Sequence, residues 1–232
     1  MEQIEATIKS SMYCEVLQNG EVAHLLEGRH GRKLRRSLRA EGMDRQLDTW
    51  IDPRLSFRIE KIISTEHQSV SLEGGITLKS AMLARTMRDC TEAICFIATI
   101  GPSIDEAVKQ ANSQHRLSDA YLIDRIGSAA IEDVVDAFQH MMHAGRRMRD
   151  EGVTLRFSPG YCDWALTEQK KLFNLVATER IGVSLSSSYL MTPRKTVSGL
   201  FGILPPGCVP YNPCKYCKRT NCKARRLQPR VL

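Results

Sequence analysis

Apolar positions along the chain follow two different spacings, and each spacing predicts a different kind of element. Residues 93–100 form a continuous apolar run, rich in β-branched and aromatic side chains, which predicts a buried strand. Residues 118–148 instead carry apolar side chains at mostly four-residue steps, which predicts one long helix. A patch of small residues at 127–130 would let that helix pack closely against its neighbours.

Weaker patterns predict the remaining elements. Apolar residues at four-residue spacing indicate a short helix at 55–63, and Ser80 and Ser103 are each placed to cap a helix, Ser103 with Glu106 completing a capping box. The other expected elements are helical spacing within 1–25, an exposed basic helix within 28–50, a strand at 76–78, a strand ending at Phe157, a helix at 169–176, and extended segments at 181–191 and 197–204.

Helices and short strands are interleaved without a regular strand-helix-strand period. The pattern therefore predicts an α+β fold with a mostly antiparallel sheet flanked by helices. The 232 residues, 42% of them hydrophobic, suffice for one large domain, or one domain with an appendage, around a substantial core. No run of about 18 apolar residues occurs, so no membrane span is expected. The polar, acidic N-terminus does not look like a secretory signal, and we expect a cytoplasmic location.

A formal net charge of +7 raises the question of an acidic partner. Much of the excess falls within 29–45 and within 215–230, two segments rich in Lys and Arg. Basic segments suit nucleic acid or an acidic protein equally well. Aromatic residues of the kind that stack on bases do not accompany them, which disfavours nucleic acid as the partner.

Four of the eight cysteines fall within fifteen residues near the C-terminus: Cys208, Cys214, Cys217 and Cys222. The segment is rich in Pro and Gly and cannot build a core of its own. Four thiolates at this spacing, with no secretory signal, predict one metal centre. The spacing is not that of a zinc ribbon with two separated pairs, so we favour a [4Fe-4S] cluster, with structural zinc as the alternative.

The residues at 156–161, Arg-Phe-Ser-Pro-Gly-Tyr, form the strongest candidate for a ligand site. Arg156 offers a fixed fork of donors for a carboxylate or phosphate. Pro159 and Gly160 predict a tight turn at which a ligand can approach bare backbone, and Tyr161 can stack on it. A plain strand-turn-helix connection with a solvated arginine is the alternative interpretation of the same residues.

Four ordered stretches resemble the activation (reactivation) domain of cobalamin-dependent methionine synthase. That family has an Arg-x-x-x-Gly-Tyr motif before a helix, as at 156–161 here. The other matching stretches are 98–102, 126–132 and 181–199, the last resembling a closing hairpin, together with 163–164 and 168–171 after the motif. The resemblance covers roughly 70–204, so we expect an activation-domain-like core at 1–204 and a Cys-rich, metal-binding tail at 205–232.

The resemblance implies a role in repairing an oxidised cobalamin. The family's domain binds S-adenosylmethionine, whose methyl group, with one electron, returns Co(II) to methyl-Co(III). Arg156 would then pair with the ligand carboxylate, and Ser158, Pro159, Gly160 and Tyr161 would line the ligand. The family binds the ligand's amino group through an acid near the start of its domain, which has no clear match here; Asp136 or Glu132 on the predicted long helix could replace it.

The chain shows no corrinoid-binding, folate or methyltransferase module, so we expect the cobalamin to be carried by a partner. Methionine synthase or another corrinoid methyltransferase is the expected partner, with an electron-donor protein besides, and the tail cluster would relay the electron. Whether the chain itself counts as an enzyme stays open. The alternatives are a non-catalytic module that binds a corrinoid protein and has a structural zinc tail, and a nucleic-acid binder.

Overall fold

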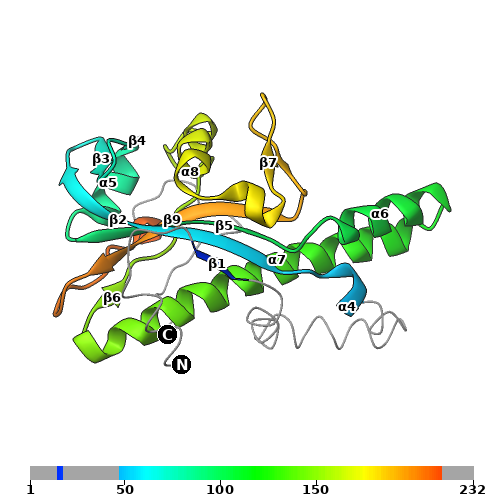
Figure 1. The fold of residues 1–232 in the computed structure, drawn as a ribbon, viewed down its shortest axis with the longest axis horizontal. Coiled ribbons are helices and arrows are strands. Elements are labelled where there is room, and N and C mark those ends of the chain that lie inside the picture. Colours follow the sequence, from blue (N-terminus) through cyan, green and yellow to red (C-terminus); the bar gives the residue numbers. More distant parts are fainter. Residues whose placement is uncertain (1–14, 18–46, 216–232) are drawn as a thin grey trace.

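The computed structural model describes residues 15–17 and 47–215, and within them one large sheet organises the molecule (Figure 1). Its seven strands are all paired antiparallel, in the order β4-β3-β2-β5-β9-β6, with β1 added on β2. Their bounds are β1 Glu15–Leu17, β2 Arg54–Thr65, β3 Ser69–Leu72, β4 Thr77–Lys79, β5 Glu92–Thr99, β6 Gly152–Val153 and β9 Thr196–Leu204. The predicted α+β class with a mostly antiparallel sheet is confirmed.

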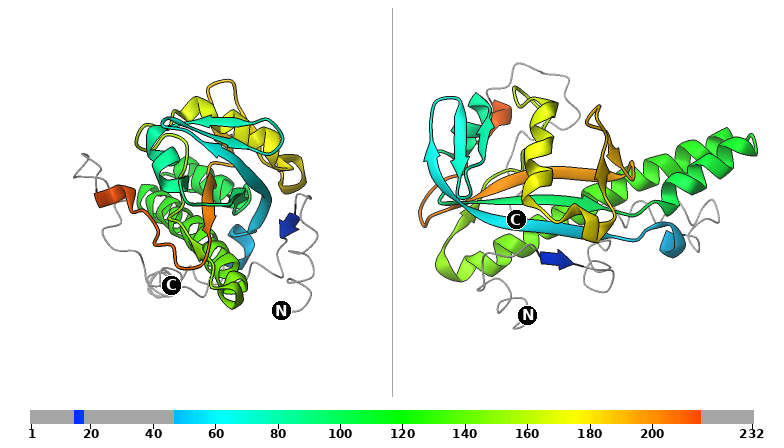
Figure 2. Two further views of the ribbon diagram at one scale, coloured as in Figure 1. Left: turned by 90° about the vertical axis from the view of Figure 1, so that its left-hand side faces the viewer. Right: turned by 45° about the horizontal axis from the view of Figure 1, so that its top comes forward.

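Helices cover both faces of this sheet. The long helix α7 (Leu117–Arg146) crosses one face, and α5 (Ala81–Met87) and α8 (Gln169–Leu175) lie on the other (Figure 1). The remaining helical segments are α4 Leu47–Trp50, α6 Ser103–Ser113, and the 3₁₀ turns η3 Arg147–Arg149, η4 Leu166–Glu168, η5 Thr178–Ile181 and η6 Pro213–Lys215. Both views in Figure 2 keep α7 and α8 on opposite sides of the sheet.

Each face of the sheet has its own apolar core. Under α7, four aromatic rings pack with centroids 5.1 to 6.0 Å apart: Phe57, Phe96, Phe138 and Phe201. The core on the opposite face joins α5, α8 and the sheet. Its fully buried side chains include Leu83, Trp164, Leu172 and Leu200. Burial of each such side chain stabilises the fold by roughly 1.5–3 kcal/mol, so both faces of the sheet are firmly anchored.

The helix expected at 55–63 is wrong, because this stretch lies within strand β2. Residues four apart in sequence share a face of a helix, but they also share a face of a strand, where the repeat is two. The burial of Leu55 and Phe57, both on the α7 face, follows the strand repeat. Pairing with β5 over eight residues decides the outcome, and β-branched residues in the segment suit it.

Helix starts were predicted with mixed success. Ser80 caps α5, accepting a hydrogen bond from the Leu83 amide at 2.9 Å, as expected. The capping box at Ser103 is wrong: Ser103 is the first residue of α6 and Pro102 occupies the cap position without a side-chain hydrogen bond. The long helix expected at 118–148 is confirmed as α7, and the strand at 93–100 as β5.

The two extended segments near the end of the chain do not pair with each other, so the expected closing hairpin is only partly right. A separate short hairpin joins β7 (Ser184–Leu185), which lies in the segment expected to be extended at 181–191, to β8 (Met191–Thr192) at its end. Strand β9 instead enters the large sheet between β5 and β6. Of the N-terminal expectations, only two short parts are described: β1 is a strand where helical spacing was expected, and α4 is helical.

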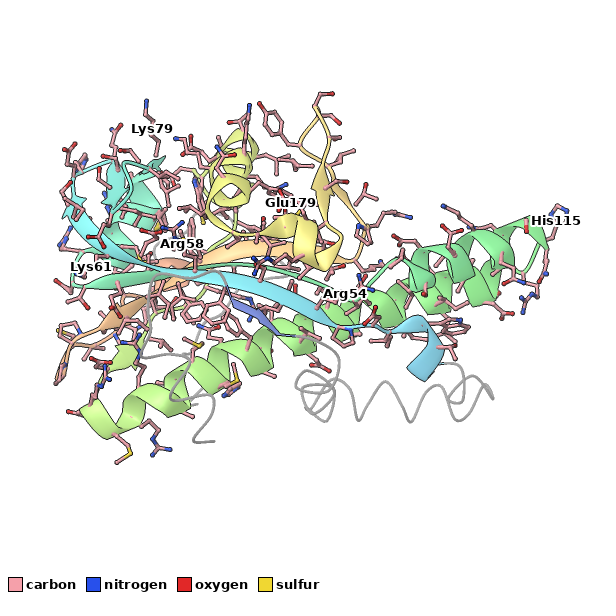
Figure 3. The ribbon with its side chains drawn as sticks, viewed as in Figure 1. Arg54, Arg58, Lys61, Lys79, His115 and Glu179 are labelled. Carbon is pink, nitrogen blue, oxygen red and sulfur yellow. The ribbon has the colours of Figure 1, made fainter. Side chains whose placement is uncertain are left out.

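In the described part of the chain, no helix is long and apolar enough to span a membrane. Helix α6 instead packs against the first part of α7, and together they extend beyond the sheet as an arm (Figure 1). His115, between the two helices, marks the far end of this arm (Figure 3).

Candidate functional site

The segment that carries the Arg-to-Tyr motif lies along the edge of the sheet. Val153 in β6 pairs with Ile203 of β9, and Phe157 rejoins the same strand by exchanging two backbone hydrogen bonds with Leu200, of 2.8 and 2.9 Å. Phe157 packs on the α5 and α8 side, where its ring stacks on Trp164 with centroids 5.9 Å apart. Since successive side chains of an extended segment point to opposite faces, Arg156 is directed to the α7 side.

Arg156 is enclosed by two acids of α7. One terminal nitrogen, Nη1, donates to Asp136 and the other, Nη2, donates to Glu132, and the Arg156 side chain is only 7% exposed. The two acids are four residues apart and therefore share one face of the helix. The alternative interpretation, a solvated arginine, is wrong, and the two acids named from the sequence do lie at the site.

The turn after Arg156 is held by its own backbone. Gly160 adopts a φ of 89°, which a residue with a side chain rarely adopts, and its amide donates to the Trp164 carbonyl at 2.8 Å. The amide of Tyr161 donates to the Ser158 carbonyl at 3.2 Å. Both amides are thus engaged within the turn. The half-exposed Tyr161 and the exposed Cys162 are side chains that the turn presents to solvent, whereas Ser158 is half-buried and Pro159 is buried.

Strand β9 comes unusually close to this turn at Gly199. A Cβ atom there would lie 2.8 Å from the Phe157 carbonyl oxygen and 3.0 Å from Ser158 Oγ. Real Cβ atoms do not come so near a backbone oxygen, so Gly199 is required for the motif segment to sit against the sheet. The sequence resemblance included residue 199 without giving a reason for the glycine.

Asp163 fixes the far end of the turn to helix α5. Its carboxylate accepts hydrogen bonds from the Ser80 hydroxyl at 2.6 Å and from the Ala81 amide at 2.7 Å, and a longer one from Met82. Burial by itself would raise the pKa of Asp163, but these hydrogen bonds to the charged form outweigh it and lower the pKa. No local pattern in the sequence predicts this cap, because the partners are more than eighty residues apart.

Trp164, which follows the turn, is fully buried in the apolar core between the sheet and helices α5 and α8. Its indole Nε1 has no hydrogen-bond partner among the described residues. The stacking of its ring on Phe157, its burial in this core and its backbone hydrogen bonds with Gly160 and Tyr161 hold the residue in place.

The Cys-rich tail begins as a segment packed against α5. The Tyr211 hydroxyl approaches Met82 Sδ at 3.9 Å, and Figure 2 shows η6 beside α5. Cys208 is exposed and Cys214 half-buried, whereas Cys217 and Cys222 lie outside the described residues. Residues 15–17 and 47–215 contain no cluster of three or more metal-ligating side chains, so the predicted metal centre is not tested by them.

Cys208 also lies near the buried thiol of Cys90. Burial, with smaller contributions from Asp89 and Cys208, raises the pKa of Cys90 to about 12. Cys90 is therefore a protonated thiol at neutral pH and a poor metal ligand in this form.

Comparisons with known proteins identify the family and the fold. The family model described as "Vitamin B12 dependent methionine synthase, activation domain" matches residues 78–208, more than half of the chain. Among solved structures, the chain is similar to the crystal structure of the MetH reactivation domain bound to AdoHcy, with a TM-score of 0.63. The two share 13% sequence identity over 87% of this chain and 81% of that one, which supports the likeness of fold. No curated protein matches the chain significantly.

Proposed function

Since the chain belongs to the family of vitamin B12-dependent methionine synthase activation domains, we propose that it reactivates a cobalamin-dependent methyltransferase. In this role it binds S-adenosylmethionine and presents the methyl group to a corrinoid carried by a separate protein, with methionine synthase the first candidate. The observation that carries the proposal is the position of Arg156. In this chain, the arginine of the family motif already binds carboxylates at both of its terminal nitrogens.

The proposed reaction balances with one electron and one methyl group. An electron-donor protein reduces Co(II) to Co(I), which then uses its electron pair to form a bond with the methyl carbon. The bond between sulfur and that carbon breaks, and its electron pair stays on sulfur, which leaves S-adenosylhomocysteine and methyl-Co(III). Because the sulfonium is reactive by itself, the protein contributes by positioning the methyl group and excluding water.

The residues at the sheet edge can supply that positioning. Arg156 would pair with the ligand carboxylate through its planar fork. Ser158, Pro159, Gly160 and Tyr161 would form the wall beside the ligand, with the exposed Tyr161 ring free to pack on it. The turn is suited to this task because it is fixed at both ends, by the Phe157 bridge to β9 and by the Asp163 cap on α5.

The tail is proposed to hold an iron-sulfur cluster through Cys208, Cys214, Cys217 and Cys222. Such a cluster supplies one-electron transfer when bound, and reactivation consumes one electron. Support comes from the contact of the tail with α5, the helix that Asp163 caps, because this places the start of the tail near the motif turn. Protein purified without oxygen should be brown and contain iron and sulfide; colourless protein with stoichiometric zinc would contradict the cluster.

Binding of S-adenosylmethionine to Arg156→Ala tests the site directly. We expect calorimetry to give clear binding to the wild type and a loss of at least about tenfold for the variant, equal to about 1.4 kcal/mol. Equal affinity in both proteins would contradict the assignment of the site.

The control for this experiment must separate binding from folding. Removing Arg156 leaves two acids without their partner, so the alanine variant can lose stability. Arg156→Lys keeps the charge but lacks the bidentate fork. It should fold with a melting temperature near that of the wild type and still bind more weakly, which would place the defect at the ligand.

A further inference from the structure

We propose that Glu132 leaves Arg156 when the ligand binds and takes the ligand's α-ammonium group, while Asp136 stays on Arg156 and holds it in place. The inference rests on the proposed function, because it takes the ligand to be an α-amino acid derivative. It assigns the acid for the amino group, for which the sequence resemblance gave no clear match, and it makes the site selective for zwitterionic head groups.

The two acids occupy Arg156 in different ways. A guanidinium can hold a carboxylate by two parallel hydrogen bonds along its end, through Nη1 and Nη2, or along its side, through Nε and Nη2. Nη2 takes part in both arrangements, and Glu132 is the residue bound to it. Asp136 is bound to Nη1. Glu132 therefore occupies the nitrogen that both arrangements use, so a ligand carboxylate competes with Glu132 at Nη2, and one that binds along the side leaves the Nη1 bond to Asp136 intact.

The solvent exposure of the two acids also indicates that Glu132 leaves Arg156 more easily than Asp136 does. The Glu132 side chain is 52% exposed, whereas that of Asp136 is 15% exposed. Water can solvate a half-exposed carboxylate once it leaves its partner, so opening this pair costs little. Removing the more buried partner would leave charges without compensation, which is far less favourable. Glu132 is thus the mobile partner and Asp136 the fixed one.

The chemistry of an α-amino acid then directs the ammonium toward Glu132. Its ammonium and carboxylate are attached to the same carbon, so a carboxylate that takes the place of Glu132 brings the ammonium beside the displaced side chain. One Arg156–Glu132 pair becomes two pairs, Arg156 with the carboxylate and Glu132 with the ammonium. No charge is left alone in the exchange.

The charge of the site favours such a ligand over a simple anion. Arg156, Glu132 and Asp136 together carry a net charge of −1 when all are ionised. S-adenosylmethionine carries a carboxylate, an ammonium and a sulfonium, and so has a net charge of +1. A phosphate, or a carboxylate without an ammonium, would pair with Arg156 but would be repelled by the two carboxylates beside it, which disfavours its binding.

Binding to Glu132→Gln tests this inference, with S-adenosylmethionine and 5′-methylthioadenosine as the two probes. The second probe keeps the nucleoside and sulfur but lacks the amino acid head. We expect about a tenfold loss of affinity for S-adenosylmethionine in the variant and no change for methylthioadenosine. Asp119→Asn is the matched control: it removes an acid that pairs with Arg116 on the same helix, thirteen residues or about 20 Å away.

The outcomes separate this inference from the function on which it rests. If Glu132→Gln binds S-adenosylmethionine as tightly as the wild type or more tightly, Glu132 is at most a blocking group and the inference fails. An equal loss for methylthioadenosine would also overturn it, because the head group would not be the cause. If the wild type binds no S-adenosylmethionine, it is the proposed function that fails.

Discussion

At the scale of single residues, Asp163 joins the motif turn to a helix 83 residues before it. The charged carboxylate accepts the hydroxyl hydrogen of Ser80, while Ser80 Oγ accepts the Leu83 amide, so one chain of hydrogen bonds satisfies the start of α5. The hydrogen bonds that lower the pKa of Asp163 favour its ionised form in the fold. The turn and the helix should therefore depend on the same charge.

Asp163→Asn should make the protein less stable by about 1–2 kcal/mol at neutral pH, since the amide replaces one of two acceptor oxygens. In the unfolded chain this carboxyl has its ordinary pKa of 3.8, so on acidification it takes up its proton before the folded one does. The stability from Asp163 is therefore complete above about pH 4 and is lost as pH falls further toward the folded pKa. Urea unfolding between pH 3 and pH 7 measures both effects.

The control for this prediction is Glu106→Gln, which removes an exposed acid that pairs with Lys109 on the surface of α6. Its stability should stay within about 0.5 kcal/mol of the wild type. If Asp163→Asn loses stability on acidification as steeply as the wild type, the carboxylate does not act as the charged cap of α5.

At the scale of elements, the sequence predicted best where one spacing had a single interpretation. The repeat in α7 was too long for a strand, and the β-branched and aromatic side chains of the run in β5 favoured a strand over a buried helix. Strand β2 was missed because residues four apart fit both a helix and a strand, and only its neighbour β5 decides between them. Ser103 failed as a cap because a suitable residue type does not by itself fix where a helix begins.

The contact between β9 and the motif segment gives a test at this scale. Gly199→Ala would place a methyl group 2.8 Å from the Phe157 carbonyl, so the motif segment must shift. We expect a loss of about 1–3 kcal/mol of stability and weaker binding of S-adenosylmethionine, measured by urea unfolding and calorimetry on the same samples.

Gly152→Ala on the same sheet edge is the matched control. Its added methyl group would meet Leu204 at 3.6 Å, an ordinary contact, so stability should change by no more than about 0.5 kcal/mol. Equal stability and binding in the two alanine variants would show that the close approach at Gly199 does not shape the site.

At the scale of the whole molecule, the candidate site depends on three parts that are distant in sequence. Helix α7 supplies Glu132 and Asp136, the sheet edge supplies Arg156, and α5 holds the turn through Asp163. The resemblance of the sequence identified the motif, and the predicted long helix offered Asp136 or Glu132 as the acid in place of the family's own. The sequence could not show that these acids bind Arg156, because that pairing follows from how α7 lies across the sheet.

Metal binding by the tail remains a prediction, but the position of its first residues is defined. Its first residues pack on α5, through Tyr211 and Met82, on the face of the sheet that also carries α8. A sequence pattern of four cysteines indicates a metal centre without indicating where it lies. The contact with α5 places Cys208 and Cys214 on the side of the molecule to which the motif turn is fixed.

Formation of methyl-cobalt tests the central claim most directly. A cobalamin-dependent methionine synthase without its own activation domain, held as Co(II), is mixed without oxygen with this protein, a one-electron donor and S-adenosylmethionine labelled in its methyl group. We predict that the spectrum changes to that of methyl-Co(III), that the label moves to the corrinoid, and that Arg156→Ala slows both. A corrinoid that stays Co(II), or is methylated equally fast without this protein, would contradict the account.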